Sequence, residues 1–472
     1  MLPRLTKIVA TLGPATDAPG VLDELLAAGV DCVRLNCSHG THDDLRRRSA
    51  EARAAAGRAG RPLGVLFDLQ GPKLRLSGST SQRAVQEGEA VRFAGAGTPA
   101  ARDAVVVEFG DFARLVTDRS QLVIGDGVPR FTVDSVDADG TGAVVARALS
   151  DGELSARKGI NVTYAKPNLP AITEKDVADL ALAAELGADF VALSFVRSAA
   201  DIEDLASRLK GHGSRARTIA KIEKVEAYEH LDEILEVADG VMVARGDYGV
   251  EAGVARVPLK QKDTILRATR RGKAVITATQ MLESMIHAPE PTRAEATDVA
   301  NAVIDGTSAV MLSAETGIGE YAVEAVRAMA EIALVAEEAP EIHGRARGDE
   351  PQTPSETVLH AAVELAEALD AAALIVPTST GGGARACAKY RRRRRPIVAL
   401  AHDPQVADQL MLEWGVHPAP ISVAESVEEL VEAALELARD AVHLPSGAPV
   451  VLTAGRRTGT PGATSLIMVR EV

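Results

Sequence analysis

Cysteine is scarce in this chain of 472 residues, which contains only Cys32, Cys37 and Cys387. Their spacing fits neither a framework of disulfides nor a zinc site. Because free thiols without such a pattern are typical of reducing compartments, we expect a cytoplasmic protein. The three thiols are expected to be buried and to act as small apolar side chains.

Long apolar runs are also missing. A membrane-spanning helix needs about 20 consecutive apolar residues, and no stretch of the chain approaches that length. The N-terminal sequence MLPRLTKIVATLGPAT lacks the uninterrupted apolar core of a signal peptide. We therefore expect a soluble protein without a membrane partner.

A net positive charge is the third absence, since the formal net charge is -14 at pH 7. An acidic chain matches neither the phosphate backbone of a nucleic acid nor an anionic membrane surface, so we expect neither as the main partner. Individual basic residues are then expected to bind small anions.

Eight short apolar segments are present, each of strand length, and helix-like stretches lie between them. Strands that are apolar on both faces are typical of a parallel sheet covered by helices, and eight such βα units are enough to close a barrel. The sequence therefore predicts an α/β fold with a (β/α)8 barrel. The segments are KIVATLG from Lys7, CVRLNCS from Cys32, LGVLFDL from Leu63, FVALSFV from Phe190, TIAKIE from Thr218, GVMVARGD from Gly240, AVITATQ from Ala274 and AVMLSAET from Ala309.

The alternation breaks between the third and fourth segments. Residues 72–166 contain short β-like runs separated by turns such as GDG and ADG, which predicts an inserted β domain. It leaves the carboxyl end of the third strand, so we expect it to cover the barrel mouth as a movable lid. The barrel would then comprise residues 1–71 and 167–343. After a linker, residues 355–472 would form a separate α/β domain.

Charged residues follow two neighbouring barrel strands where active sites of such barrels lie. Lys221 and Glu223 are two positions apart, so the period of a strand points both side chains to one face. Asp247 follows the next strand and brings a second carboxylate. Two carboxylates suit Mg²⁺, and the ammonium would face a transferring phosphoryl group. The alternative is a surface ion pair beside an ordinary loop.

Other strands of the predicted barrel also end in polar residues. Arg34 offers a guanidinium to a phosphate, and Asn36 and Ser38 alternate with it on one face. Arg75 would be a second phosphate ligand, and the Thr279 hydroxyl could hold a substrate carboxylate. Taken alone, Arg34 or Arg75 would be interpreted as a solvated surface charge. Because both are expected at the same barrel mouth, we interpret them as phosphate ligands.

Several long motifs occur together over essentially the whole chain, and with them the chain resembles the pyruvate kinase family. The resemblance implies a TIM barrel, an inserted small β-barrel lid, a C-terminal three-layer α/β domain and a homotetramer. It also implies a phosphotransferase reaction, in which the phosphoryl group of phosphoenolpyruvate moves to ADP, giving pyruvate and ATP at the end of glycolysis. The motifs are KIVATLGP, RLNCSHG, DLQGPKLR, AKIEKVEA, MVARGDYGVE, ATQMLESM, PTRAEATDVANAVIDG and MLSAET.

The same resemblance implies roles for the residues that match the family's motifs. Lys221 would stabilise the phosphoryl group in flight, and Glu223 and Asp247 would hold Mg²⁺ or Mn²⁺. The amides of Gly246 and Asp247 with the Thr279 hydroxyl would hold the substrate carboxylate, and Lys221 and Thr279 are the catalytic candidates. The substrate phosphate would bind Arg34, and the nucleotide phosphates would bind Asn36, Ser38, His39, Arg75 and the lid residue Lys158.

The chain departs from the family at the site of the monovalent cation. Members that require K⁺ carry Glu where this chain has Lys73, and Thr where it has Leu69. A fixed ammonium at Lys73 could replace the ion, so we expect K⁺ to be dispensable. The alternative is that Lys73 faces solvent and the ion still binds at Asn36, Ser38 and Asp68.

The C-terminal domain contains the sequence TSTGGG between a strand-like and a helix-like stretch, a pattern that can bind an anion at a helix start. By resemblance this loop and the later segment TAGRRTGTPG would bind a phosphorylated effector, either a sugar phosphate or a nucleotide. The alternative is a glycine-rich turn with an idle cap. The arginine run at 391–395 is interpreted as a solvated face. The loop residues are Thr378, Ser379, Thr380, Gly381, Gly382 and Gly383.

Two other functions compete with the kinase interpretation. One is a magnesium-dependent barrel such as an aldolase or phosphomutase acting on enolpyruvate, but a lyase has no nucleotide phosphates for Arg75 and Lys158 to hold. The other is a catalytically inactive binding protein on the same fold. Such a protein should have lost residues such as Lys221, Glu223 or Thr279, and all are present.

Overall fold

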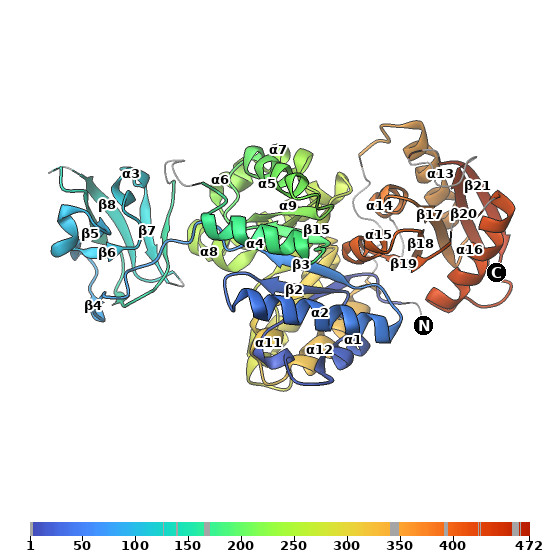
Figure 1. The fold of residues 1–472 in the computed structure, drawn as a ribbon, viewed down its shortest axis with the longest axis horizontal. Helices are drawn as coiled ribbons and strands as arrows, with labels where there is room; N and C mark the ends of the chain where they lie inside the picture. The colour runs from blue at the N-terminus through green and yellow to red at the C-terminus, as the bar shows by residue number, and fades with distance from the viewer. Residues whose placement is uncertain are drawn as a thin grey trace.

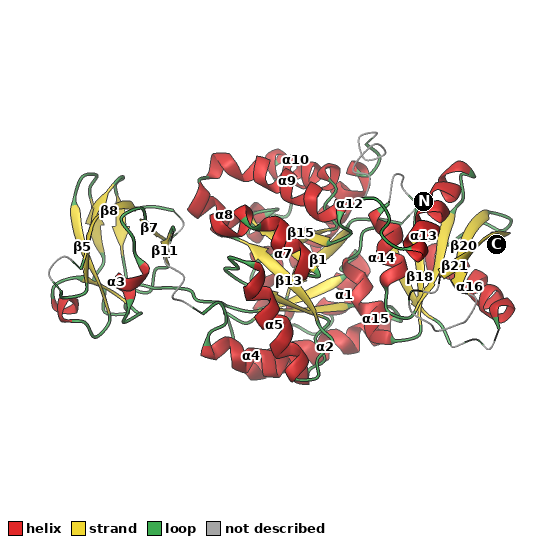
Figure 2. Ribbon diagram, turned by 90° about the horizontal axis from the view of Figure 1, so that it is seen from above, coloured by secondary structure: helices red, strands yellow, loops and turns green. Residues whose placement is uncertain are grey.

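The chain folds into three parts along one long axis (Figure 1). In the computed structural model a β domain lies at one end, a large α/β barrel in the middle and a second α/β domain at the other end (Figures 1 and 2). The structure describes residues 3–125, 127–137, 140–164, 170–339, 349–390, 395–422, 424, 426–455, 462 and 464–472.

Eight parallel strands form the closed barrel, as the sequence predicts. Nearly every residue of these strands is buried, which explains why each strand is apolar on both faces. In order around the barrel they are β1 (Lys7–Thr11), β16 (Ala309–Leu312), β15 (Ala274–Ala278), β14 (Gly240–Ala244), β13 (Arg217–Ile222), β12 (Phe190–Leu193), β3 (Gly64–Asp68) and β2 (Cys32–Asn36).

Helices cover the outside of the barrel (Figure 2). Three of them begin at a threonine, Thr41, Thr173 or Thr292, whose hydroxyl accepts a backbone N–H of the first turn. Such caps satisfy amides that would otherwise lack a partner, so they define where these helices start. The barrel helices are α1 (Val21–Ala28), α2 (His42–Ala59), α4 (Glu174–Glu185), α5 (Ala199–Gly211), α6 (Val225–Glu229), α7 (Leu231–Val237), α8 (Arg245–Ala252), α9 (Val257–Arg270), α10 (Arg293–Asp305), α11 (Ala314–Gly317) and α12 (Ala322–Ala336).

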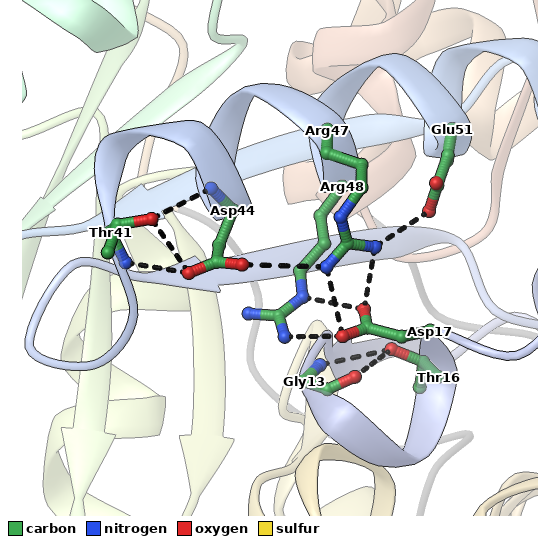
Figure 3. Close-up of polar contacts among 8 residues, drawn as sticks. All are labelled: Gly13, Thr16, Asp17, Thr41, Asp44, Arg47, Arg48 and Glu51. Carbon is green, nitrogen blue, oxygen red and sulfur yellow. Dashed lines mark hydrogen bonds and ion pairs between the residues drawn. The ribbon is translucent and has the colours of Figure 1, made fainter.

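Helix α2 is fastened to the loop that follows β1 (Figure 3). Arg48 donates through Nε and Nη2 to the two carboxylate oxygens of Asp17, both at 2.8 Å, and Arg47 Nη2 donates to Asp17 at 3.0 Å. The hydrogen bond from Arg48 above all lowers the pKa of Asp17 to about 2. Since Thr41 caps the same helix, this anchor also fixes the end of the loop of residues 37–40 that precedes it.

The inserted domain is a closed β structure. Its six-stranded sheet has the order β11-β7-β8-β9-β5-β6, and β10 pairs with β4. Bridges between Arg75 and Gly159 and between Leu76 and Val107 join the two edges of the sheet, so it closes around an apolar core as a small barrel. Its elements are β4 (Arg83–Val85), β5 (Ala90–Gly95), β6 (Val105–Val107), α3 (Phe112–Leu115), β7 (Gln121–Ile124), β8 (Arg130–Val136), β9 (Ala143–Ala148), β10 (Gly152–Leu154) and β11 (Ile160–Val162).

The C-terminal domain has three layers. Its sheet has the order β19-β18-β17-β20-β21, helices α13 and α14 pack on one face, and α16 packs on the other. Its elements are α13 (Pro354–Ala368), β17 (Ala373–Thr378), α14 (Gly382–Lys389), β18 (Ile397–Ala401), α15 (Pro404–Gln409), the 3-10 turn η6 (Leu410–Leu412), β19 (Val416–Pro420), α16 (Val427–Val442), β20 (Pro449–Gly455) and β21 (Thr464–Glu471).

The C-terminal domain closes the amino end of the barrel. Leu412 is fully buried in the same apolar cluster as Val9 and Phe190 on barrel strands. Beside it, Lys7 Nζ donates to the carbonyl oxygen of Val416 at 2.6 Å, and burial lowers the pKa of Lys7 to about 8. The two domains therefore share a packed interface and are not merely tethered.

The expected fold is confirmed, and the three cysteines are buried and unpaired as expected. The predicted boundaries at residues 166 and 343 and part of the linker at 344–354 lie outside the described residues, so the domain limits stay predictions. No helix in the described parts of the chain is long and apolar enough to cross a membrane.

Candidate functional site

Lys221 lies at the centre of a buried charged cluster at the carboxyl end of the barrel strands. Its Nζ atom is 2.9 Å from Glu223 Oε1 and 3.2 Å from Asp68 Oδ1, and it donates to Ser194 Oγ at 2.7 Å. Burial lowers the pKa of Lys221, but the two carboxylates outweigh burial and leave it above its ordinary value. The ammonium is therefore charged at neutral pH.

Arg34 and Asp68 form the second part of this cluster. Arg34 Nε and Nη2 each lie 2.7 Å from Asp68 Oδ2, and Nη1 donates to Thr11 Oγ1 at 3.1 Å. Burial raises the pKa of Asp68, but the charges of Lys221 and Arg34 outweigh it, so the net shift is downward. A guanidinium has five N–H donors, so these contacts leave two for a bound anion.

The two acidic residues predicted to hold a divalent cation are neighbours. Glu223 is 1% exposed, its Oε2 atom accepts the N–H of Phe195 at 2.8 Å, and Asp247 lies in the first turn of α8. Burial raises the pKa of Glu223, Lys221 offsets part of the rise, and the charge of Asp247 adds to it.

This arrangement fits a divalent cation, because a bound positive charge relieves the repulsion between the two carboxylates. Among the described residues no group of three or more His, Cys, Asp and Glu side chains converges on a metal position. An ion held here would therefore take its remaining ligands from substrate oxygens and water.

The Thr279 hydroxyl faces the start of α8. Its Oγ1 atom accepts the N–H of Gly246 at 2.8 Å and donates to the carbonyl oxygen of Ala278 at 2.6 Å. The first amides of a helix attract anions. In this structure the Gly246 N–H and the Thr279 O–H are both donated within the protein, so a small carboxylate would have to take over these two donors and add the amide of Asp247.

Cationic side chains gather around His39, on the loop that precedes α2. Its pKa is lowered by burial first and then by the charges of Lys73, Arg34 and Arg75, so the imidazole is neutral at pH 7 while three cations surround it. Within the same loop Asn36 Oδ1 accepts the N–H of Ser38 at 3.0 Å. A polyphosphate would meet concentrated positive charge here.

The lid carries the remaining nucleotide candidate, Lys158. Its Nζ atom donates to the carbonyl oxygen of Glu153 at 3.0 Å and lies 3.7 Å from Glu153 Oε1, so it is bound within the lid and makes no described contact with the barrel cluster. Arg75 Nη1 donates to the carbonyl oxygen of Arg157 at 3.3 Å. The sequence predicts Arg34 and Arg75 at one mouth, with Lys158 joining them only when the lid closes, so the position of Lys158 within the lid leaves its nucleotide role a prediction.

Two of the residues predicted at the monovalent-cation site are poor ligands for an ion in this structure. The Asp68 carboxylate is taken by Arg34 and Lys221, and the buried Leu69 side chain offers no oxygen. Lys73 is exposed, as the alternative interpretation expects, although its charge contributes to the lowered pKa of His39.

A cavity of about 430 Å³ lies at the glycine-rich loop of the C-terminal domain. Thr378 Oγ1 accepts the N–H of Gly381, the N-cap residue that precedes α14, at 3.0 Å. Of the later predicted segment, residues 456–461 lie outside the described residues, as do 391–394 of the arginine run. The loop residues that line the cavity are Thr378, Ser379, Thr380, Gly382 and Gly383.

Three residues of the site were not predicted from the sequence. Ser194 and Phe195 follow β12 directly, so the rule that polar strand ends meet at one mouth could have found Ser194. Arg245 contacts the backbone after β15, and nothing in the local sequence indicates that contact.

Comparison with known proteins agrees with this architecture. Residues 3–326 match the family model of the pyruvate kinase barrel domain, and residues 356–470 match that of the pyruvate kinase alpha/beta domain. The chain is 40% identical to a pyruvate kinase of Geobacillus stearothermophilus, over 99% of this chain and 80% of that protein. It is also 40% identical to a pyruvate kinase of Mycobacterium tuberculosis, over 99% and 98% of the two chains.

Proposed function

The chain belongs to the pyruvate kinase family and is a phosphotransferase, and from this premise we propose how its own residues move the phosphoryl group of phosphoenolpyruvate to ADP. The observation that carries the proposal is the Lys221 ammonium, buried between two carboxylates and kept charged beside Arg34. Phosphoryl transfer needs fixed positive charge at the phosphoryl oxygens, and this cluster supplies it.

The substrate would be held at its two anionic ends. Its carboxylate would take hydrogen bonds from the Thr279 hydroxyl, which would give up its contact with Ala278 O, and from the amides of Gly246 and Asp247, of which the first would give up Thr279 Oγ1. Its phosphate would take the two N–H donors that Arg34 does not use in its contacts with Asp68 and Thr11. Fixing both ends orients the phosphoryl group toward Lys221.

Members of this family use Mg²⁺, and the carboxylates of Glu223 and Asp247 would hold it or Mn²⁺. When bound, the ion polarises phosphoryl oxygens as a Lewis acid. Before it binds, Arg34, Lys221, Asp68, Glu223 and Asp247 together carry one net negative charge, which a divalent ion converts to a positive one. An anionic substrate then meets a site of opposite charge.

In the transfer step Lys221 would stabilise the negative charge that spreads over the phosphoryl oxygens. Its three N–H donors are taken by Ser194, Glu223 and Asp68 in this structure. At least one of these contacts must therefore lengthen when the phosphoryl group arrives. Because all three partners are fixed on barrel strands or directly after them, the ammonium moves little and its charge stays aimed at one place.

ADP would bind on the side of His39, where Lys73, Arg34 and Arg75 concentrate positive charge. Lys158 would join them when the lid closes, giving up its contact with Glu153. Closure would also exclude water, which favours transfer to ADP over hydrolysis.

Two observations support the proposal that K⁺ is dispensable. Two cations already bind the Asp68 carboxylate, and the buried side chain of Leu69 is apolar. The Lys73 ammonium would supply the positive charge instead. A K⁺-free coupled assay of pyruvate formation from phosphoenolpyruvate and ADP with Mg²⁺ tests both points. Activity equal to that with added K⁺ supports both points, and activity only with K⁺ refutes the role of Lys73. No activity of the folded protein in either buffer points first to an obligatory activator, and no activity with the effector panel below as well refutes the transfer itself.

Regulation by a phosphorylated effector is a further part of the proposal. The cavity at the glycine-rich loop supports it, and so does Arg385, which donates to Thr380 O at 2.9 Å and to Glu413 Oε1 at 3.0 Å. Glu413 directly follows Leu412, which packs into the barrel, so the loop is linked to the barrel indirectly, through Arg385 and the segment of Leu412 and Glu413. The test is a panel of sugar phosphates and nucleotides at subsaturating phosphoenolpyruvate. The homotetramer and the cytoplasmic location also stay predictions, and light scattering tests the first.

A further inference from the structure

The turn after β15 has an unusual backbone. Thr279 has φ 68° and Gln280 has φ 53°, so two consecutive residues other than glycine lie in the left-handed region. A β-branched residue such as threonine rarely adopts this conformation, and such strain persists only where neighbouring groups hold it in place. Strain of this kind is found at active sites, and Thr279 is the residue proposed to bind the substrate carboxylate.

Arg245 is the neighbour that holds this turn. Its Nη2 atom donates to the carbonyl oxygens of Thr279 at 2.7 Å and Gln280 at 3.0 Å, and its Nε atom lies 3.1 Å from Thr279 O and 3.2 Å from Ala278 O. One guanidinium thus binds three successive carbonyl groups. A planar group with fixed N–H directions can do this, whereas a lysine ammonium cannot reproduce the pattern.

Asp298 holds the guanidinium from the other side. Its Oδ2 atom lies 2.6 Å from Arg245 Nη1, and the Arg245 side chain is 10% exposed. Asp298 belongs to α10 and Arg245 begins α8, so the pair ties two barrel helices to the turn between them in space. A short hydrogen bond to a carboxylate orients a guanidinium, and Gln261 Oε1 also accepts from Nη1, at 3.5 Å.

The direction of these contacts matters for the hydroxyl. The carbonyl groups of residues 278–280 are bound by Arg245, while Thr279 Oγ1 is turned to the amide of Gly246, the residue that directly follows Arg245. The Arg245 side chain therefore binds the backbone of the turn, and the amide of the next residue, Gly246, binds the Thr279 hydroxyl. A shift of Arg245 moves both partners of the hydroxyl together.

We propose that Arg245, oriented by Asp298, is a positioning residue that fixes the Thr279 hydroxyl for the carboxylate of the enolpyruvate substrate. The inference rests on the proposed function, since it takes Thr279 as the ligand of that carboxylate. We propose no contact between Arg245 and the nucleotide, because the predicted nucleotide ligands Arg75 and Lys158 lie on other elements. The expected signature is a loss confined to the enolpyruvate substrate.

Steady-state kinetics of the full-length chain with each substrate varied tests this proposal. For R245M we expect kcat/KM for phosphoenolpyruvate to fall about 100-fold, the loss typical of a catalytic group displaced by about 1 Å, with the KM for ADP unchanged. R245K should recover little of the loss, D298N should show a smaller loss of the same kind, and added guanidinium ion should partly restore R245M. R267M is the matched control, because Arg267 Nε donates to Asp232 at 3.0 Å on the outside of the barrel.

T279A, measured in parallel, separates this proposal from the proposed function. If T279A keeps the kcat/KM of the wild-type chain for phosphoenolpyruvate, the role of Thr279 is wrong. If T279A loses activity and R245M does not, the positioning role of Arg245 is overturned while that of Thr279 stands. Equal losses for both substrates in R245M, R245K and D298N would also overturn it, because they indicate a general structural role. If R245M does not fold, the same comparison of the kinetic constants for phosphoenolpyruvate and ADP in R245K and D298N decides the question.

Discussion

Replacing Asp68 by asparagine tests the buried charge cluster, because the change keeps the shape of the side chain and removes its charge. Asp68 Oδ1 lies 3.2 Å from Lys221 Nζ, and at an effective dielectric constant of about 20 two unit charges at that distance interact by about 5 kcal/mol. One unit of pKa corresponds to about 1.4 kcal/mol. Even if relaxation removes most of this interaction, we expect the Lys221 pKa to fall by more than one unit in D68N. Burial lowers this pKa, and in D68N only the Glu223 carboxylate remains to raise it.

The readout is the pH dependence of kcat in the coupled assay. In the wild-type chain the alkaline limb set by Lys221 lies above the ordinary lysine range, because its pKa is raised. In D68N we expect this limb to move down by more than one pH unit. D189N is the matched control: Asp189 is fully buried in the same barrel, burial raises its pKa to about 7, and it pairs with Arg53 and not with Lys221. An alkaline limb in D68N that coincides with that of the wild-type chain and of D189N would refute the reasoning.

Three further predictions concern other parts of the molecule. Mg²⁺ affinity measured by calorimetry should increase as the pH rises through the raised pKa of Glu223, because the bound ion competes with a proton, and E223Q should bind Mg²⁺ weakly with no such dependence. K73E should make the coupled assay depend on K⁺, and equal rates of K73E with and without K⁺ would contradict the replacement of the ion. L412A should destabilise the protein by about 2–5 kcal/mol in denaturant unfolding, because Leu412 is fully buried, whereas L259A, at a side chain 72% exposed, should change little.

The sequence was informative where one local rule decides the outcome. Parallel strands present their carboxyl ends at the same edge, so Lys221, Glu223 and Thr279 could be placed together from eight strand-like segments. The alternation within β13 put Lys221 and Glu223 on one face, and their 2.9 Å contact confirms it.

The sequence did not reveal which side chains these residues contact. Asp68 could be assigned to a cation site from its motif, but its engagement by Arg34 and Lys221 depends on how the strands of the closed barrel are staggered. The positive φ of Thr279 runs against the intrinsic preference of threonine, so a local pattern predicts the opposite. The contact of Leu412 with barrel strands joins residues that lie more than 100 positions apart in the sequence, which no local pattern can predict.

The roles proposed for Arg34, Thr279 and the acidic pair all depend on phosphoryl transfer taking place beside Lys221. The most direct test of that claim is the kcat of pyruvate formation for the wild-type chain and for K221M, with Mg²⁺ present. K221M must first be shown to fold, by circular dichroism, and to bind phosphoenolpyruvate, by calorimetry. We predict that kcat falls at least about 100-fold, as when one preorganised donor to transition-state charge is lost. A folded K221M that binds phosphoenolpyruvate and keeps the wild-type kcat would contradict the account.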